Sequence, residues 1–446
     1  MRDYYEEYHK KLVNADEAVK VVKSGDWIDY PLVLCAANEL EKALSKRKNE
    51  LRDVKFRSTM SVWPRYCIEA DQEGLHFCWN SWHFSNADRR NAPKGLAYYI
   101  PMRFSEQVAM TRNIRTDIFM ATVSPMDKHG YFSFGAAASA SWASIAKARY
   151  VILEINRNMP RVLGGNQECI HISQVDMVVE SSNQPLPEII PAQPTSVEIT
   201  IAEHIINRMK NGSCLQLGIG GIPSAIGSLV AQSDLKDLGV HSEMYVDAFV
   251  DMTLAGKISG ACKNIDKYKQ VFNFAFGSRR MYDFIDDNPG VISYSVDYIN
   301  SPEVISQNDK VVSINAGLEV DLFGQVCSES IGTRQISGTG GQLDFVEGAY
   351  KSRGGQSFLC LPATYASSTG QIVSNIKPTL TPGAIVTDPR TTTHMVVTEF
   401  GIGDLKGKST WERAETLINI AHPLFREGLI KEAQRMNIWR KTNRIY

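Results

Sequence analysis

The segment KNGSCLQL, residues 210–217, leads to the fold prediction because an earlier segment of the same chain resembles it. KSGDWIDY, residues 23–30, repeats its lysine, its glycine and the run that alternates apolar and polar residues. Each segment follows a stretch with helical periodicity and has the composition of a short strand. A helix followed by a strand, found twice, suggests a duplicated α/β unit.

A second pair of segments supports the duplication. Asp127 and Gly130 in MDKHGYFSFG align with Asp321 and Gly324 in VDLFGQV. The two pairs of segments are separated by offsets of 187 and 194 residues, and they occur in the same order. One short match can arise by chance, but two in the same order favour tandem domains.

Strand-like and helix-like runs alternate along the whole chain, which predicts an α/β fold with largely parallel sheets. The proline-rich segment SSNQPLPEIIPAQPTSVE, residues 181–198, has no helical period and is typical of a linker. We therefore predict an N-terminal domain at residues 1–185 and a C-terminal domain at residues 195–446. The predicted strands are DVKFRSTMSV, RYVILEI, SCLQLGIG, KVVSINA, SFLCLP, AIVTDP and HMVVTEF.

Composition excludes several classes of protein. The 446 residues are 43% hydrophobic and carry a net charge of −1, so no global field favours nucleic acid or an anionic membrane. No apolar run reaches the roughly 18 residues that span a bilayer. The eight cysteines form no CxxC pair, which is typical of reduced residues in a cytoplasmic protein without structural zinc.

The glycine-rich segment LGIGGIPSAIGSLV, residues 217–230, is the first candidate site. A strand enters a turn containing Gly218, Gly220 and Gly221, and Pro223 marks a helix start. Exposed amides there can hold a phosphate or an oxyanion, although a tight turn without a ligand is the alternative. Gly218 and Gly220 also imitate a dinucleotide fingerprint, but Pro223 replaces its third glycine.

Two further features belong to the same predicted domain. GTGGQLDF, residues 338–345, brings Gly338, Gly340 and Gly341 into a second flexible loop. Glu243 lies inside GVHSEMYVDAF, an otherwise apolar segment in which a carboxylate is costly unless it is hydrogen-bonded or paired. It is either a strand-end acid with an ordinary partner, or a nucleophile or general base. His241 would lie on the same face of the strand.

Several motifs then carry a resemblance to a known family. LGIGGIP, GVHSEMYVD, INAGLEVDLFGQV, SGTGGQLDF and VVTEFG occur in the order and spacing of the acetyl-CoA hydrolase/transferase family. First-domain segments, including KGLAYYIPMRFSE and PMDKHGYFSFG, match as well. The resemblance covers essentially the whole chain and is closest to enzymes that transfer CoA between butyrate and acetate, followed by 4-hydroxybutyrate CoA-transferases.

The resemblance implies two domains of the NagB/RpiA/CoA-transferase type and a ping-pong CoA transfer. Glu243 matches the catalytic glutamate, Asn300 matches an asparagine that polarises the thioester, and Gly341 matches a backbone donor. The first glycine loop matches the CoA-contacting loop of the family, and we expect the second loop to contact CoA too. The CoA-contacting residues are expected to be Gly218, Ile219, Gly220, Gly221, Ile222, Gly338, Gly340 and Gly341.

The resemblance also implies a cytoplasmic homodimer or higher homo-oligomer with short-chain acyl-CoA and carboxylate substrates. We expect no tightly bound cofactor or metal and no nucleic-acid or membrane partner. Pro31 and Leu32 depart from the family pattern, which leaves the exact acid open. The alternatives are an acyl-CoA hydrolase on the same scaffold, a dinucleotide-dependent oxidoreductase and a non-catalytic binding protein.

Overall fold

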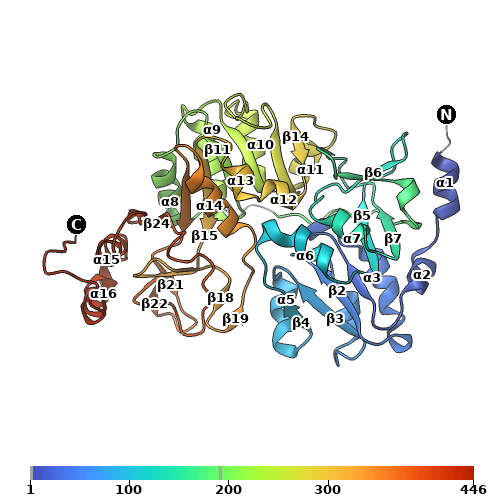
Figure 1. The fold of residues 1–446 in the computed structure, drawn as a ribbon, viewed down its shortest axis with the longest axis horizontal. Helices are drawn as coiled ribbons and strands as arrows, with labels where there is room; N and C mark the ends of the chain where they lie inside the picture. Colours follow the sequence, from blue (N-terminus) through green and yellow to red (C-terminus); the bar gives the residue numbers. More distant parts are fainter. Residues whose placement is uncertain (1–3, 190–192, 446) are drawn as a thin grey trace. The chain divides into compact units, whose positions relative to one another are not determined.

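The chain forms two compact units in a computed structural model that describes residues 4–189 and 193–445 (Figure 1). Unit 1 comprises Met1–Ile190, Glu243–Tyr245 and Lys269–Ile299, and unit 2 comprises the remaining three segments. The chain therefore passes between the units several times. The predicted domain limits, 1–185 and 195–446, stay a prediction.

Unit 1 is built on a seven-stranded sheet in which every pair of neighbours is parallel. Its order is β10 (Met177–Glu180), β7 (Tyr150–Ile155), β5 (Ile118–Val123), β1 (Trp27–Asp29), β2 (Val54–Ser58), β3 (Phe77–Ser81) and β4 (Ala97–Tyr99). Helices in the crossovers include α3 (Asn38–Ser45), α4 (Tyr66–Ala70), α5 (Asn86–Asn91), α6 (Gln107–Asn113) and α7 (Ser141–Ile145). The strands β13 (Gln270–Ala275), β14 (Val291–Ser293) and β8 (Leu163–Gly164) also belong to unit 1 and pair in parallel in that order.

The central strands of unit 1 are apolar on both faces because both faces are covered. All six residues of β5, IFMATV, are buried. One face of β5 and β7 packs against the antiparallel pair β6 (Tyr131–Ser133) and β9 (Cys169–His171) and against Tyr8 of α1 (Tyr4–Lys11). Continuous apolar runs in the sequence therefore reflect buried parallel strands, as predicted.

Unit 2 has the same central arrangement. Its sheet runs β25 (Gly401–Asp404), β24 (Met395–Thr398), β20 (Gln356–Cys360), β15 (Val311–Ala316), β11 (Cys214–Leu217) and β12 (Gly239–Tyr245). All of these pairs are parallel except β24 with β25. Helices α8 (Ser196–Ile206), α9 (Gly221–Gln232), α10 (Asp247–Leu254) and α14 (Gln342–Lys351) belong to this unit. The prediction of an α/β fold with largely parallel sheets is confirmed.

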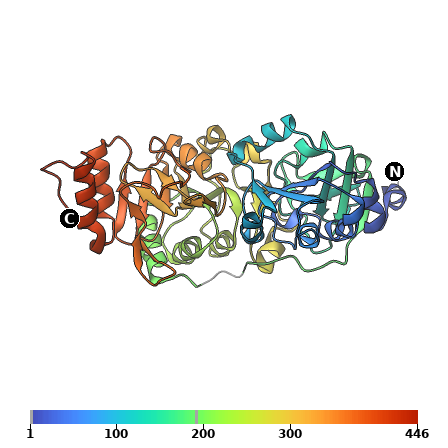
Figure 2. The ribbon, with the colours of Figure 1, turned by 90° about the horizontal axis from the view of Figure 1, so that it is seen from below.

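The C-terminal part of unit 2 ends in two packed helices, α15 (Thr410–Asn419) and α16 (Pro423–Arg435) (Figure 2). Their buried leucine and isoleucine side chains join the core formed by Leu359 and Val396 of the sheet. No helix in the described part of the chain is long and apolar enough to cross a membrane.

The turns that follow the two aligned aspartates have the same hydrogen bonds. The Asp127 Oδ1 atom accepts the backbone N–H groups of residues 129 and 131 at 2.8 and 3.0 Å. Asp321 Oδ1 accepts those of residues 323 and 325 at 3.1 and 2.9 Å. Gly130 and Gly324 occupy the fourth position of the turns that begin at these aspartates, with φ of +84° and +88°, which glycine tolerates. The short sequence match therefore corresponds to a repeated local structure.

One predicted strand, AIVTDP at residues 384–389, is wrong. The segment has the β-branched residues of a strand, but it forms only an isolated bridge between Asp388 and Val326. Ile385 and Val386 are exposed, and Gly383 turns the chain with φ of +84°. Local propensity for a strand is overridden here because the segment pairs with a neighbour only at the single bridge to Val326.

Candidate active site

Each unit has a cavity at the point of its sheet where successive strands begin to be added on the opposite side. From β1 the chain adds β2, β3 and β4 on one side and β5, β7 and β10 on the other. In unit 2 the same change occurs between β11 and β15. Parallel sheets bind ligands at the carboxyl ends of the strands at such points.

The cavity of unit 2 measures about 150 Å³ and contains the start of the first glycine loop. Ile219 and Ile222 supply apolar surface, and Asn315 supplies a polar side chain. Burial raises the pKa of the Cys360 thiol at the end of β20, so this wall is uncharged. The complete lining is Gly218, Ile219, Ile222, Pro223, Ile314, Asn315, Ala316 and Cys360.

A buried amide network fixes the polar side of this cavity. Gln216 Oε1 accepts the Ser313 hydroxyl at 2.8 Å, and Asn315 Nδ2 donates to Gln216 Oε1 at 3.2 Å and to Ser313 Oγ at 2.9 Å. These bonds join β11 to β15, so the Asn315 amide is held by the sheet. Sequence reasoning missed both amides, although Gln216 aligns with Asp29 in the internal repeat.

The glycines of the first loop have different surroundings. A Cβ added at Gly218 or Gly220 would meet no atom within 4 Å, and Gly220 has a φ of +120°. A Cβ added at Gly221 would lie 2.1 Å from Glu198 Oε1. The Glu198 carboxylate also completes a capping box with Thr195 at the start of α8. Gly218 and Gly220 therefore adjoin open space, whereas Gly221 makes room for a carboxylate.

This arrangement bears on the kind of ligand that the loop can hold. Helix α9 begins at Gly221, and its N-terminus would favour an anion. Glu198 already places a carboxylate against that residue. A second negative charge there would be repelled. The geometry therefore suits a neutral part of a ligand better than a phosphate.

The second glycine loop precedes α14, whose N-cap is Gly341. Gly338 and Gly341 are buried, and Gly340 has a φ of +53°. The structure places this loop in unit 2, as it does the first loop.

Glu243 lies near the end of β12 in unit 1, and it is the one position of that strand that is only partly buried. Two residues later, the Tyr245 hydroxyl donates to Gln270 Oε1 at 2.9 Å, and its ring lies 5.4 Å from that of Phe272. The backbone that carries Glu243 is therefore anchored to β13. The prediction of a carboxylate within a buried strand agrees with this arrangement.

Two other predicted residues are fully or almost fully buried. Asn300 follows the short helix α12 (Val296–Ile299). His241 lies on β12, with its ring 6.3 Å from that of Phe345 in α14. Ser242, next to Glu243, receives the Leu217 N–H on its hydroxyl at 3.3 Å, so the carboxyl ends of β11 and β12 are held together.

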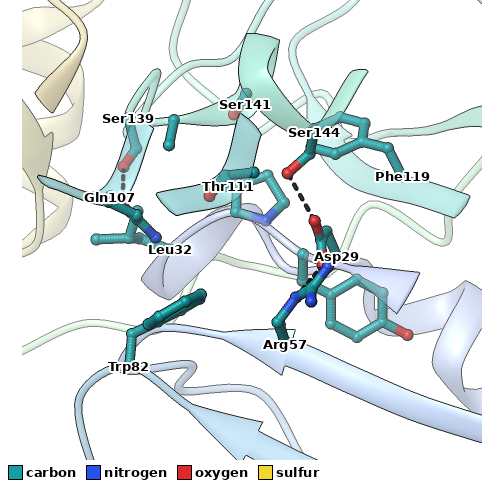
Figure 3. Close-up of a pocket in the computed structure, with 13 residues that line it drawn as sticks. Asp29, Leu32, Arg57, Trp82, Gln107, Thr111, Phe119, Ser139, Ser141 and Ser144 are labelled. Atoms are coloured by element: carbon teal, nitrogen blue, oxygen red, sulfur yellow. Dashed lines mark hydrogen bonds and ion pairs between the residues drawn. The ribbon is translucent and has the colours of Figure 1, made fainter. Parts of the chain in front are cut away.

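The cavity of unit 1 is smaller, at about 20 Å³, which is room for roughly one water molecule. Figure 3 shows Leu32, Trp82, Gln107 and Ser139 around it. Ser139 has a φ of +42°, and its hydroxyl donates to Gln107 Oε1 at 3.3 Å. Pro31 also lines the cavity. Unusual backbone conformations next to a cavity are characteristic of binding sites.

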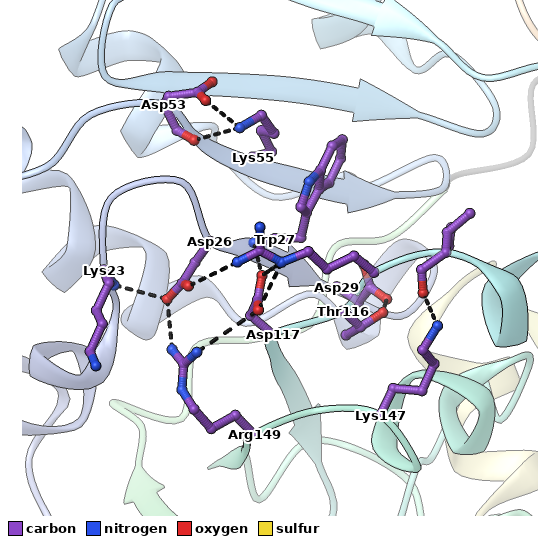
Figure 4. A network of polar contacts seen from close by, with 12 residues as sticks. Lys23, Asp26, Trp27, Asp29, Asp53, Lys55, Thr116, Asp117, Lys147 and Arg149 are labelled. Atoms are coloured by element: carbon purple, nitrogen blue, oxygen red, sulfur yellow. Dashed lines mark hydrogen bonds and ion pairs between the residues drawn. The ribbon is translucent and has the colours of Figure 1, made fainter.

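A buried ion pair forms the floor of this second cavity. Arg57 Nε donates to Asp29 Oδ1 at 2.7 Å, and the hydroxyls of Thr116 and Ser144 donate to Asp29 Oδ2 at 2.6 and 2.7 Å. The Arg57 guanidinium also lies 4.6 Å from the Trp27 ring. Figure 4 shows Asp29 and Thr116 together with the neighbouring ion pairs of Asp26 and Asp117. No sequence motif indicates this pair, and only Asp29 lies within the internal repeat.

The internal repeat and the register of the strands together relate Glu243 to Thr59. Asp29 on β1 pairs with Arg57 on β2. Continuing the β11–β12 register by one residue pairs Gln216 with His241. Arg57 and His241 are therefore equivalent positions. Two residues after Arg57 the chain has Thr59, and two residues after His241 it has Glu243. Only the second of these equivalent positions carries a carboxylate.

The described residues hold no group of three or more histidine, cysteine, aspartate or glutamate side chains arranged to bind a metal.

The whole fold is found in solved structures. The crystal structure of RipA from Yersinia pestis has a TM-score of 0.90 and 36% sequence identity, and the match covers 98% of this chain and all of that one. The chain thus shares its α/β architecture with this protein over 98% of its length.

Sequence comparison defines the family. The acetyl-CoA hydrolase/transferase N-terminal domain matches residues 1–191, and its C-terminal domain matches residues 277–433. A probable butyrate:acetyl-CoA coenzyme A-transferase of Syntrophomonas wolfei is 60% identical over 99% of this chain and 98% of its own length. A butyryl-CoA:acetate CoA-transferase of Anaerostipes caccae is 51% identical over 99% of this chain and its whole length. The chain belongs to the acetyl-CoA hydrolase/transferase family and is an enzyme of the CoA-transferase class.

Proposed function

We propose that the enzyme moves CoA between short-chain carboxylic acids, with butyryl-CoA and acetate as the principal pair. The proposal is carried by one observation, the 60% identity along 99% of the chain to a protein named for the exchange between butyrate and acetyl-CoA. The position of Glu243 at the anchored end of β12 supports a covalent route. A cytoplasmic location and a homo-oligomeric state stay predictions.

The proposed mechanism uses Glu243 as the nucleophile. One carboxylate oxygen attacks the carbonyl carbon of the acyl-CoA thioester, the C–S bond breaks, and CoA leaves as a thiolate. The thiolate then attacks the Glu243 carbonyl carbon of the mixed anhydride and releases the first acid as a carboxylate. The second acid attacks the resulting glutamyl-CoA thioester, and the same steps in reverse return Glu243 to a free carboxylate.

The other predicted site residues stabilise charge or hold the coenzyme in this proposal. Gly341 supplies a backbone N–H to the oxygen of the reacting carbonyl, and Asn300 polarises the thioester. The loop from Gly218 to Ile222 contacts CoA, with the second glycine loop beside the reacting end. Because Glu198 lies against Gly221, the neutral amide-containing arm of CoA suits the first loop better than its phosphates.

The cavity of unit 1 bears on which carboxylic acid the enzyme accepts. Its volume of about 20 Å³ is small, and Pro31 and Leu32 contribute to its wall. We propose that these two residues limit the length of the acid that the enzyme accepts. A 4-hydroxybutyrate or other short-acyl transferase remains the alternative for the exact substrate.

The activity is tested by mixing the enzyme with butyryl-CoA in the presence and absence of acetate. We expect acetyl-CoA and butyrate to form in equal amounts, and only when acetate is present. Free CoA that accumulates at the same rate without acetate would instead establish the hydrolase alternative, in which water resolves the intermediate. A panel of short acids then ranks the acceptors.

The glycines of the first loop give a test of the CoA contact. Gly218→Ala adds a methyl group in open space, so we expect an unchanged melting temperature. If CoA packs there, the overpacking costs about 1–3 kcal/mol and raises the KM for butyryl-CoA by roughly five- to 150-fold.

Gly221→Ala, in the same loop, tests the effect of a methyl group on stability. Its methyl group would displace the Glu198 carboxylate and disturb the capping box of α8, so we expect a loss of about 1 kcal/mol of stability. An unchanged KM in Gly218→Ala would contradict the assignment of this loop to CoA.

A further inference from the structure

A buried glutamate that the proposed mechanism does not use lies beside the second glycine loop. Glu329 stands between β17 (Val326–Cys327) and β18 (Ser330–Ile331) in unit 2. Its side chain is only 3% exposed. A carboxylate at that depth requires hydrogen bonds to be tolerated.

The partners of this carboxylate come from the loop and its approach. The Thr339 hydroxyl lies 3.3 Å from both Glu329 oxygens. Gln335 Nε2 donates to Oε2 at 3.3 Å, and the Thr387 hydroxyl donates to Oε1 at 3.1 Å. The Glu329 backbone carbonyl accepts the N–H groups of Ile336 and residue 337 at 2.7 and 3.2 Å.

The second glycine loop has few side chains that could form stabilising contacts. Three of its four residues, Gly338, Gly340 and Gly341, are glycines, which lose the most conformational freedom when a loop is fixed. Thr339 is the only residue of the loop with a side chain, and that side chain bonds to Glu329. Glu329 therefore fixes the loop at its centre.

The neighbouring residue fixes the far end of the loop. Gln342 Nε2 donates to Ser328 Oγ at 2.7 Å, and the Ser337 hydroxyl donates to the Ser328 carbonyl at 3.0 Å. The consecutive residues Ser328 and Glu329 thus anchor the loop before, within and after its glycines.

A backbone donor stabilises a developing oxyanion only when it is already in place, because reorganisation during the reaction would consume the benefit. We propose that Glu329 is a positioning residue that fixes the Gly338–Gly341 loop, and with it the Gly341 N–H, for CoA transfer. The inference rests on the proposed function.

The test compares Glu329→Gln and Glu329→Ala with the wild-type enzyme in butyryl-CoA:acetate transfer. Loss of one oxyanion donor lowers kcat about 10²- to 10³-fold, so a displaced donor should lower it by roughly 10- to 100-fold. We expect this loss in Glu329→Ala with a KM for butyryl-CoA within about threefold of wild type, since ground-state binding is unaffected. Glu329→Gln keeps the shape and should recover part of the rate.

Glu319→Gln is the matched control. Glu319 is also a buried acid of unit 2, and its oxygens accept the N–H and hydroxyl of Thr381, which is outside the glycine loop, at 2.8 and 2.7 Å. We expect it to match Glu329→Gln in melting temperature while keeping the wild-type kcat.

The outcomes separate the two proposals. The positioning role would be overturned if Glu329→Gln and Glu319→Gln lost kcat equally, or if the Glu329 variants changed only the KM. If the wild-type enzyme still transferred CoA in that case, the transferase proposal would stay intact. Absence of acetate-dependent transfer by the wild-type enzyme would overturn both.

Discussion

Glu243→Gln is expected to lower kcat for butyryl-CoA:acetate transfer by roughly 10³-fold or more, because an amide cannot form the anhydride or the glutamyl thioester. Glu243 is held at the end of β12, where Tyr245 bonds to Gln270 at 2.9 Å. The substitution preserves shape and removes one charge, so the fold should persist. Initial rates of acetyl-CoA formation measure the loss.

Glu319→Gln serves as the control here too, since it neutralises a buried acid elsewhere in the chain. We expect it to retain most of the wild-type rate. Glu243→Asp should also be strongly impaired, because the carboxylate is withdrawn by one methylene. A Glu243→Gln enzyme with near-wild-type turnover would contradict the covalent mechanism and favour direct attack by the acceptor acid.

Asp29→Asn is expected to destabilise unit 1 by about 3–5 kcal/mol, because it leaves the Arg57 guanidinium buried without a compensating charge. Arg57 and Asp29 are each about 5% exposed. The change also disturbs the bonds from Thr116 and Ser144 to the same carboxylate. Denaturant unfolding monitored by tryptophan fluorescence measures the loss.

The matched control is Asp53→Asn, which breaks the ion pair between Asp53 and Lys55. This pair is at the surface, where such pairs contribute about 0–1 kcal/mol. Asparagine tolerates the φ of +56° that Asp53 adopts. Equal destabilisation by the two variants would contradict the view that the floor of the unit 1 cavity depends on a buried ion pair.

The sequence predicted the elements whose physics is local. Apolar runs became buried parallel strands, and the glycine-rich segment at residues 217–230 became the β11–α9 turn. The strand predicted for AIVTDP was wrong because its residues favour a strand, whereas strand pairing depends on a neighbour that is distant in the sequence. Asp29 and Arg57 escaped prediction for the same reason, since β1 and β2 bring them together across 28 residues.

The same distinction between local and long-range features applies to the candidate site. The glycine loops could be found because glycine spacing is visible in one segment, and Glu243 because a carboxylate stands out in an apolar run. Glu198 and Glu329 could not, because their significance lies in contacts with Gly221 and Thr339 that only folding creates. The internal repeat aligns Asp29 of the unit 1 cavity with Gln216, whose side chain bonds to Asn315 of the unit 2 cavity.

Intact mass measurement of the enzyme mixed with butyryl-CoA, without an acceptor acid, tests the covalent mechanism most directly. We predict a mass increase equal to one CoA minus water, mapped to Glu243 by peptide digestion, absent in Glu243→Gln and removed when acetate is added. No adduct at any time point, while the same preparation transfers CoA to acetate at its full rate, would contradict the proposal that Glu243 carries CoA.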